Sequence, residues 1–301
     1  MRRGAAPPGG LVANTRSADA IDRRATPGPI HVLTYHKIDT RPDIGINTVS
    51  PRRFERHLTT LLSLGLQPLD MPSVIRVAAE GVARQDAGVH ITFDDGYQDF
   101  LDHAWPLCVR HGFPATVFPV AAYVGRRNTW DLSFPRTSHL TWAGLRELSD
   151  AGVTVGAHTE THPFLSRIPL EHARAEIVDS KARLEDGIGR GVSVFAYPHG
   201  DSSPSLARLV EDAGYSAAFS LDPSVPMGPT TRWQSPRTAV YALDGARGIA
   251  AKVGRRGTGP MRRAWAINRL FRRCGYAGLL VPGRRGPSRI VEEDGVCGTG
   301  R

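Results

Sequence analysis

Two adjacent carboxylates, Asp94 and Asp95, end a short apolar run at residues 90–96, and a glycine follows them. Side chains of a strand alternate in direction, so neighbouring aspartates at a strand end can serve different tasks. One can hold a metal ion while the other stays free as a general base. Two like charges this close also raise one of the two pKa values, which suits a base working near neutral pH. The alternative is a solvated Asp-Asp-Gly turn that closes the strand.

Three other short apolar runs also end in polar residues that can bind a metal or move a proton. Residues 31–35 lead into His36, residues 152–157 lead into H-T-E-T-H-P at 158–163, and residues 191–196 lead into Y-P-H-G at 197–200. Each run is rich in β-branched residues and follows a helix-compatible stretch, a pattern typical of buried parallel strands separated by helices. In closed β/α barrels the chemistry sits at the carboxyl ends of the strands, because the loops converge there. We therefore expect the four polar clusters to form one site.

The remaining pattern fits alternating strands and helices. Apolar runs at 115–120 and 216–219 bring the number of expected strands to about seven, which favours a distorted seven-stranded barrel over a full eight. One predicted helix begins at Pro51, and its apolar stripe is formed by Phe54, Leu58, Leu61 and Leu62. Others are predicted after Pro169, over 99–111 and over 203–213, and the last two are each followed by a glycine.

Two of these sequences resemble a known family. T-F-D-D-G at 92–96 and H-T-E-T-H-P at 158–163 resemble the first two motifs of the NodB-homology polysaccharide deacetylases, carbohydrate esterase family 4. The likeness extends over residues 30–240. It implies an α/β fold of the distorted (β/α)7 barrel type and a metal-dependent hydrolase. It also implies Asp94 as the catalytic base and Asp95, His158 and His162 as the metal ligands.

One carboxylate and two imidazoles leave coordination positions open, as a hydrolytic metal site requires. Zn²⁺ is the expected ion, and Fe²⁺, Co²⁺ or Ni²⁺ also suit such ligands. The histidines are four residues apart, but Gly156 and Pro163 mark the stretch as a loop rather than the helix of an H-E-x-x-H zinc motif. Glu160 stands one place too late for that motif, so we interpret it as a bystander.

The chain departs from the family pattern in the third motif, where the family carries an arginine that orients the base. The sequence A-Y-P-H at 196–199 has no arginine there. Arg237, which follows a later strand-like stretch, is a candidate to replace it, although the sequence does not place it in space. The backbone N–H of His199 is a candidate oxyanion donor, and Tyr197 belongs to the same substrate-facing stretch.

The family's last motif, Leu-x-x-His near the C-terminus, has no counterpart, because His199 is the last histidine of the chain. Residues 33–36 have that form at the start of the barrel. First and last strands of a closed barrel are neighbours, so a histidine moved between them can occupy nearly the same point in space. Family members with an N-terminal Tyr-His-x-Ile segment, resembling the deacetylases of poly-N-acetylglucosamine export, look like this rearrangement. His36 is then the acid that protonates the leaving amine; the alternative is a histidine that caps a buried strand.

The net charge of +9 belongs to a C-terminal extension rather than to the barrel. Residues 245–290 contain twelve Arg and Lys and no Asp or Glu, so the rest of the chain is mildly acidic. Residues 261–273 are compatible with a helix that carries most of its arginines on one side, which predicts peripheral association with an anionic membrane. The alternative is an ordinary helix packed on the barrel with a solvated arginine face. Nucleic acid is not expected as a partner, because no recognised binding fold accompanies the charge.

We predict three parts: a disordered segment at 1–28, a barrel at 29–243 and the basic extension at 244–301. The first segment is rich in Arg, Pro, Gly and Ala but has no apolar core of a secretory signal. No stretch approaches the ~20 apolar residues of a membrane span. These features favour a cytoplasmic location, although a misassigned start codon would produce the same pattern. Three scattered cysteines indicate neither a disulfide framework nor a cysteine-ligated metal.

The leading hypothesis is a metal-dependent amidohydrolase that removes acetyl groups from N-acetylated sugars of a polysaccharide or glycolipid. One rival is the same chemistry on a non-sugar amide or an ester, which a fold resemblance does not separate. Another is a carbohydrate-binding pseudoenzyme that lost turnover together with the arginine of the third motif.

Overall fold

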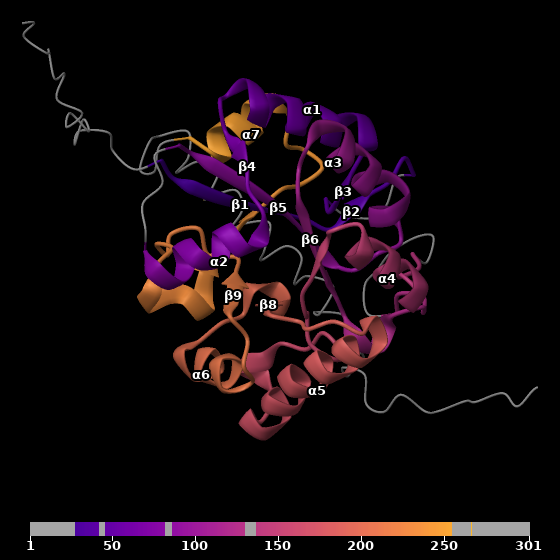
Figure 1. The fold of residues 1–301 in the computed structure, drawn as a ribbon, viewed down its shortest axis with the longest axis vertical. Coiled ribbons are helices and arrows are strands. Elements are labelled where there is room, and N and C mark those ends of the chain that lie inside the picture. The colour runs from indigo at the N-terminus through magenta and orange to yellow at the C-terminus, as the bar shows by residue number, and fades with distance from the viewer. Residues whose placement is uncertain (1–27, 42–45, 82–85, 130–136, 255–265, 267–301) are drawn as a thin grey trace, which may run out of the picture.

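Helices surround a central set of strands in the computed structural model, which describes residues 28–41, 46–81, 86–129, 137–254 and 266 (Figure 1). The strands are β1 (Ile30–Tyr35), β2 (Lys37–Ile38), β3 (Thr48–Val49), β4 (Gln67–Pro68), β5 (Gly88–Asp95), β6 (Ala115–Pro119), β7 (Thr154–Val155), β8 (Val194–Ala196), β9 (Ala217–Ser220), β10 (Ser235–Pro236) and β11 (Thr238–Ala239). Every pairing between these strands is parallel. The predicted α/β class is therefore confirmed.

The strand order runs through two main sheets, which are connected at both ends. One sheet has the order β11-β1-β5-β6-β7, with β4 also paired to β5, and a second has the order β10-β9-β8. A parallel bridge between Ala157 and Phe195 connects the end of β7 to β8. β10 and β11 are two halves of one segment interrupted at Arg237; the first half pairs with β9 and the second with β1. This path agrees with the predicted α/β barrel type, although the strand pairing divides it into two sheets and does not close one ring.

Helices cover the outside of the strands (Figure 1). The α-helices are α1 (Pro51–Ser63), α2 (Met71–Glu80), α3 (Trp105–His111), α4 (Trp142–Asp150), α5 (Leu170–Ile188), α6 (Pro204–Asp212) and α7 (Ala246–Lys252). A π-helical turn, η1 (Phe100–Ala104), precedes α3, and 3₁₀ turns are η2 (Ala121–Tyr123), η3 (Leu165–Arg167), η4 (Pro198–Gly200) and η5 (Pro229–Gln234). In α1 the stripe at Phe54, Leu58 and Leu61 is buried as predicted, but Leu62 is 40% exposed. The buried face of α1 is thus narrower than the apolar stripe expected from its sequence.

Aromatic packing fixes the two strands that carry the first polar clusters. Tyr35 at the end of β1 lies 5.0 Å from the ring of Phe54 and 5.7 Å from that of Phe93 on β5. Phe93 in turn packs against Phe100 with ring centroids 4.5 Å apart. All of β5 is buried, because helices cover one side and the barrel interior fills the other. This packing holds the ends of β1 and β5 in place, next to His36 and the two carboxylates.

The predicted basic extension begins with a helix that packs on the folded body. Helix α7 lies against α1. Lys252 is 2% exposed, and its Nζ donates to Oδ2 of Asp244 and to the carbonyl of Ala239, both at 2.6 Å. The backbone carbonyl of Asp244 lies 2.7 Å from Nε2 of His57 on α1. Residues 244–254 therefore belong to the same packed unit as the strands.

Residues 261–273, for which a membrane-binding helix is predicted, lie outside the described residues apart from Ala266. The predicted disordered segment at 1–28 also lies outside them, except for Gly28. Within the part of the chain that the structure describes, no helix combines the length and apolar character needed to cross a membrane.

Candidate active site

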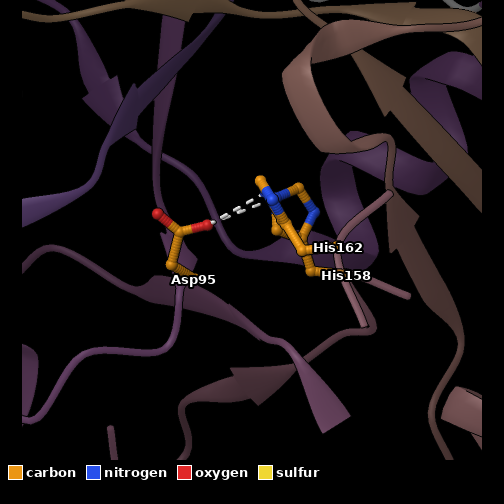
Figure 2. A group of neighbouring side chains, drawn as sticks. All are labelled: Asp95, His158 and His162. Carbon is orange, nitrogen blue, oxygen red and sulfur yellow. Dashed lines mark ion pairs between the residues drawn. The ribbon is translucent and has the colours of Figure 1, made fainter. Parts of the chain in front are cut away.

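Asp95, His158 and His162 meet at the carboxyl ends of the strands (Figure 2). Asp95 ends β5, and the two histidines come from the loop that follows β7. Oδ1 of Asp95 lies 3.6 Å from Nε2 of His158 and 3.3 Å from Nε2 of His162. The ligand atoms of all three lie within 4.8 Å of one another. The structure thus brings together the three residues predicted to bind a metal.

The environment of His158 and His162 favours the uncharged imidazole, the form that binds a metal ion. Nδ1 of His158 lies 2.8 Å from the carbonyl of Ala196, which fixes Nδ1 as the protonated nitrogen and turns the lone pair of Nε2 toward Asp95. Burial lowers the pKa of His158 to about 4, against the opposing charge of Asp94. Burial, together with the charges of neighbouring histidines, also holds the pKa of His162 well below its usual value. Two neutral imidazoles beside one carboxylate fit a divalent transition metal such as zinc.

Asp94 is paired with Arg237 in the barrel interior. Nη1 of Arg237 donates to Oδ1 at 2.6 Å and Nη2 donates to Oδ2 at 2.9 Å, so the contact is bidentate. Burial raises the pKa of Asp94, but the charges of Arg237 and then His158 outweigh it, and the pKa lies below its usual 3.8. Asp94 is therefore held as a carboxylate. The expectation that an adjacent charge raises the pKa of the base is wrong for Asp94, because the charge of Arg237 lowers it. Arg237 thus makes the contact with the predicted base that a replacement for the missing arginine of the third motif would make.

Thr92 contacts Arg237 directly and Thr34 contacts Thr92, two contacts that the sequence does not indicate. Nη1 of Arg237 also donates to Oγ1 of Thr92 at 3.2 Å. The Thr92 hydroxyl donates to the carbonyl of Leu33 and lies 2.8 Å from Oγ1 of Thr34. The guanidinium carbon lies 5.2 Å from the centre of the Phe118 ring, a cation–π distance. These contacts come from β1, β5 and β6, so the barrel itself orients the arginine.

Left-handed backbone conformations gather at this site. Among the described residues, those other than glycine with positive φ are Asp95 (68°), Thr159 (66°), His162 (65°) and His199 (60°). Such conformations cost free energy in residues that carry a Cβ, and they persist where the surrounding structure enforces them. Gly96 follows Asp95 at φ 70°, where an added Cβ would lie 2.7 Å from the backbone of Pro119. The sharp turn after β5 therefore requires glycine.

His36 follows β1 and lies beside Asp94, because the parallel register pairs the preceding residues Tyr35 and Phe93. Its imidazole is partly exposed, and its charge influences the pKa of Asp94, which places it at the same site. The structure thus brings the predicted acid next to the predicted base.

His199 and Tyr197, predicted to face the substrate, are placed differently from one another. The ring of His199 stacks on Phe164 at 3.8 Å and meets the ring of His162 edge-on at 4.6 Å. Burial, followed by the charge of nearby histidines, lowers the pKa of His199 to about 3. Tyr197 is fully buried, and its hydroxyl donates to the carbonyl of Trp233 at 2.7 Å. The side chain of Tyr197 therefore packs in the hydrophobic core.

Glu160, interpreted as a bystander, lies between the two histidines in sequence but turns away from them. Its Oε1 pairs with Nε of Arg183 on α5 at 2.8 Å. Burial raises the pKa of Glu160, and the charge of Arg183 opposes this rise. The residue is not part of the three-ligand cluster.

Comparison with known proteins matches residues 81–218 to the polysaccharide deacetylase family. YxkH of Bacillus subtilis (strain 168), named provisionally as a polysaccharide deacetylase, is 25% identical over 73% of this chain and 72% of its own length. The poly-beta-1,6-N-acetyl-D-glucosamine N-deacetylase of Escherichia coli (strain K12) is 22% identical over 63% of this chain. The aligned part is about a third of the E. coli protein, 33% of its length.

Solved structures show the same fold. The deacetylase PplD of Streptococcus pyogenes in complex with acetate superposes with a TM-score of 0.66 and 19% identity, covering 76% of this chain and 100% of that one. IcaB of Ammonifex degensii gives 0.64 and 23% identity, covering 76% and 97%. These matches show that the chain has the fold of these structures, the fold expected from the two motifs at the strand ends. Residues 81–218 match the polysaccharide deacetylase family model, in agreement with the resemblance that the sequence predicts.

Proposed function

We propose that this protein is a metal-dependent hydrolase that removes acetyl groups from N-acetylated sugars of a polysaccharide or glycolipid. The observation that carries the proposal is a buried, ionised Asp94 locked by Arg237 directly beside the cluster of Asp95, His158 and His162. An ionised carboxylate that does not belong to the ligand set, next to a three-ligand metal site, is the arrangement that amide hydrolysis requires.

Asp95, His158 and His162 would hold the metal, and Zn²⁺ is the ion we propose. Nε2 of each histidine and one carboxylate oxygen make a donor set of the kind found in hydrolytic zinc sites, with positions left for water and substrate. When bound, such an ion lowers the pKa of water and polarises the acetamide carbonyl. Fe²⁺, Co²⁺ and Ni²⁺ suit the same donors.

Asp94 would take the proton from the attacking water. Its pKa, held below 3.8 by Arg237 against the effect of burial, keeps the carboxylate ready at neutral pH. The bidentate contact also fixes the direction of the carboxylate lone pairs. The pairing weakens the pseudoenzyme alternative, which assumed that no arginine orients the base.

His36 would protonate the leaving amine. In the register of β1 with β5, His36 is next to Asp94. It follows the first strand, whereas the histidine of the family's last motif comes near the C-terminus. The backbone N–H of His199, at the strained turn after β8, is the proposed oxyanion donor. Tyr197 would contribute through the backbone of this turn, since its side chain is buried.

Relatives support the substrate class. Several are named poly-beta-1,6-N-acetyl-D-glucosamine N-deacetylases, including proteins of Escherichia coli and Staphylococcus aureus. We therefore propose an N-acetylglucosamine-containing glycan as the substrate. Peripheral association of residues 261–273 with an anionic membrane and a cytoplasmic location remain predictions from the sequence.

The test is acetate release from N-acetylglucosamine oligomers by the metal-loaded protein, with and without EDTA. Release that EDTA abolishes and Zn²⁺ restores is expected, while aryl acetates and non-sugar amides should be poorer substrates. No release from any N-acetylated sugar would overturn the proposal. Asp95→Ala should lose the metal, whereas Asp94→Asn should keep the metal and lose turnover. An Asp94→Asn protein that purifies without metal would refute the division of tasks between the two aspartates.

A further inference from the structure

One carboxylate outside the metal cluster holds the loop that carries both histidine ligands. Glu176 on α5 accepts two backbone hydrogen bonds through Oε2, from the N–H groups of Glu160 and Thr161, each at 2.8 Å. Its Oε1 accepts a third from the hydroxyl of Thr161 at 2.5 Å. Glu176 therefore binds the segment between the two histidines with both of its oxygens.

This segment needs such support because strained residues flank it. Thr159 and His162 adopt φ values of 66° and 65°, and the two N–H groups bound by Glu176 lie between them. Hydrogen bonds to a carboxylate are stronger than those to a neutral acceptor, so the contact can offset the strain of two left-handed residues. The turn places His158 and His162 so that both Nε2 atoms face Asp95.

Two backbone carbonyls of the loop are held by main chain, and the N–H of His162 donates to Oγ1 of Thr159 at 3.0 Å. The carbonyls of Thr159 and Glu160 accept from the N–H groups of Ala121 and Ala122 at the start of η2, at 3.1 and 3.0 Å. These bonds do not depend on any side chain. The N–H side of the same peptide groups depends on Glu176, so one substitution removes three of the hydrogen bonds that hold the loop.

We propose that Glu176 is a positioning residue for the metal centre: it fixes the turn that presents His158 and His162 to one ion. The inference rests on the metal site of the proposed function and adds a residue outside the ligand set. Partners of ligand-bearing groups commonly change metal affinity by about 10–100-fold when they are removed. A Glu176→Ala protein should therefore bind Zn²⁺ about 10–100-fold more weakly.

Two further variants separate hydrogen bonding from charge. Glu176→Gln keeps the length and one acceptor oxygen, so it should restore most of the affinity. Asp179 lies on the same helix, and its negative charge also acts on Glu160. None of the described hydrogen bonds of the loop involves Asp179, so Asp179→Ala removes a nearby charge and leaves the clamp intact.

The experiment is a titration of the metal-free proteins with Zn²⁺ against a chromophoric chelator, followed by visible spectra of the Co²⁺-loaded proteins. Glu176→Ala should lose affinity and change the Co²⁺ spectrum, while Asp179→Ala should match the wild type in both. Unchanged affinity and spectrum in a folded Glu176→Ala protein would overturn the inference, as would an equal loss in Asp179→Ala. If Glu176→Ala does not fold, Glu176→Asp, one methylene shorter, must show the loss that Glu176→Gln does not.

These measurements use no substrate, so they are independent of acetate release. A protein that binds Zn²⁺ through this clamp but releases no acetate would refute the proposed function and leave the role of Glu176 standing. Acetate release with normal Zn²⁺ binding in Glu176→Ala would do the reverse.

Discussion

Replacing Arg237 by methionine is expected to change the pH dependence of hydrolysis. The guanidinium donates to both oxygens of Asp94 at 2.6 and 2.9 Å, and the two side chains are 0% and 2% exposed. Burial raises the pKa of Asp94, and the charge of Arg237 is the largest effect that lowers it. Methionine keeps a long apolar side chain over Phe118 but removes the charge. The burial effect is then left opposed only by the weaker influence of the histidines.

The expected magnitude follows from this geometry. An opposite charge at such a distance lowers a carboxyl pKa by about 1–3 units, so its removal should raise the pKa of Asp94 by a similar amount. That is about 1.4–4 kcal/mol of preference for the carboxylate. A general base works only when it is deprotonated, so activity is lost as the pH falls through its pKa. The acid limb of kcat/KM should therefore move up by about 1–3 pH units in Arg237→Met.

The assay is acetate release by the metal-loaded wild type and variant between about pH 5 and pH 9. The kcat/KM of the wild type divided by that of the variant should grow as the pH falls. Arg190→Met is the control, because Arg190 pairs with Asp150 at 2.6 Å on the surface, where such pairs contribute little. A ratio that stays constant across the range would refute the reasoning and assign Arg237 a packing role. Urea unfolding should be measured as well, since breaking a buried ion pair costs about 3–5 kcal/mol of stability.

Three other perturbations probe separate parts of the molecule. His36→Ala should keep its metal and lose about 10²–10⁴ in kcat on an acetamide, with a smaller loss on an aryl acetate, whose leaving group needs no proton; equal losses would make His36 structural. Burial raises the pKa of Asp99 from 3.8 to about 7, so the free energy of unfolding should fall as the pH rises between those two values. Asp99→Asn should remove that fall and gain up to about 4 kcal/mol over the wild type in urea unfolding above neutral pH, and no gain would refute the burial argument. A chain ending at Gly254 should stay folded and active but bind anionic liposomes less, whereas one ending at Asp244 should be insoluble because it lacks Lys252; a soluble, active chain ending at Asp244 would contradict this.

The sequence predicted the parts of the site that lie in contiguous motifs. Asp94 and Asp95 end one strand, and His158 and His162 share one short loop, so spacing and residue type already indicate chemistry. Parallel strands bring their carboxyl ends to the same edge, which makes the meeting of these clusters predictable. The family resemblance then assigned Asp95, His158 and His162 as candidate metal ligands, and the structure places these three side chains together.

Residues that act through tertiary contacts were harder to predict. Arg237 was a candidate, but its pairing with Asp94 depends on a segment 143 residues further along the chain. Glu176 was not found at all, because a glutamate on an amphipathic helix looks like any solvated charge. Tyr197 shows the converse: its place in a motif suggested a substrate contact, while its side chain is buried and bonded to Trp233. Motif membership fixes where the backbone goes, and packing decides which way a side chain points.

The strand pairing explains why Arg237 and His36, 201 residues apart in the sequence, can both lie near the proposed base Asp94. The register of β1 with β11 pairs Leu33 with Thr238, so Arg237, which precedes Thr238, enters from the strand next to β1. β1 pairs on its other edge with β5, where Tyr35 lies opposite Phe93, so the next residues, His36 and Asp94, are neighbours. Both residues lie outside the matched family region at 81–218, yet strand pairing places them beside it. Because β11 pairs with β1 and β1 pairs with β5, the residues near Asp94 are set by strand pairing rather than by sequence distance. An arginine or a histidine can therefore come from a different motif of the sequence and still reach the same place beside Asp94.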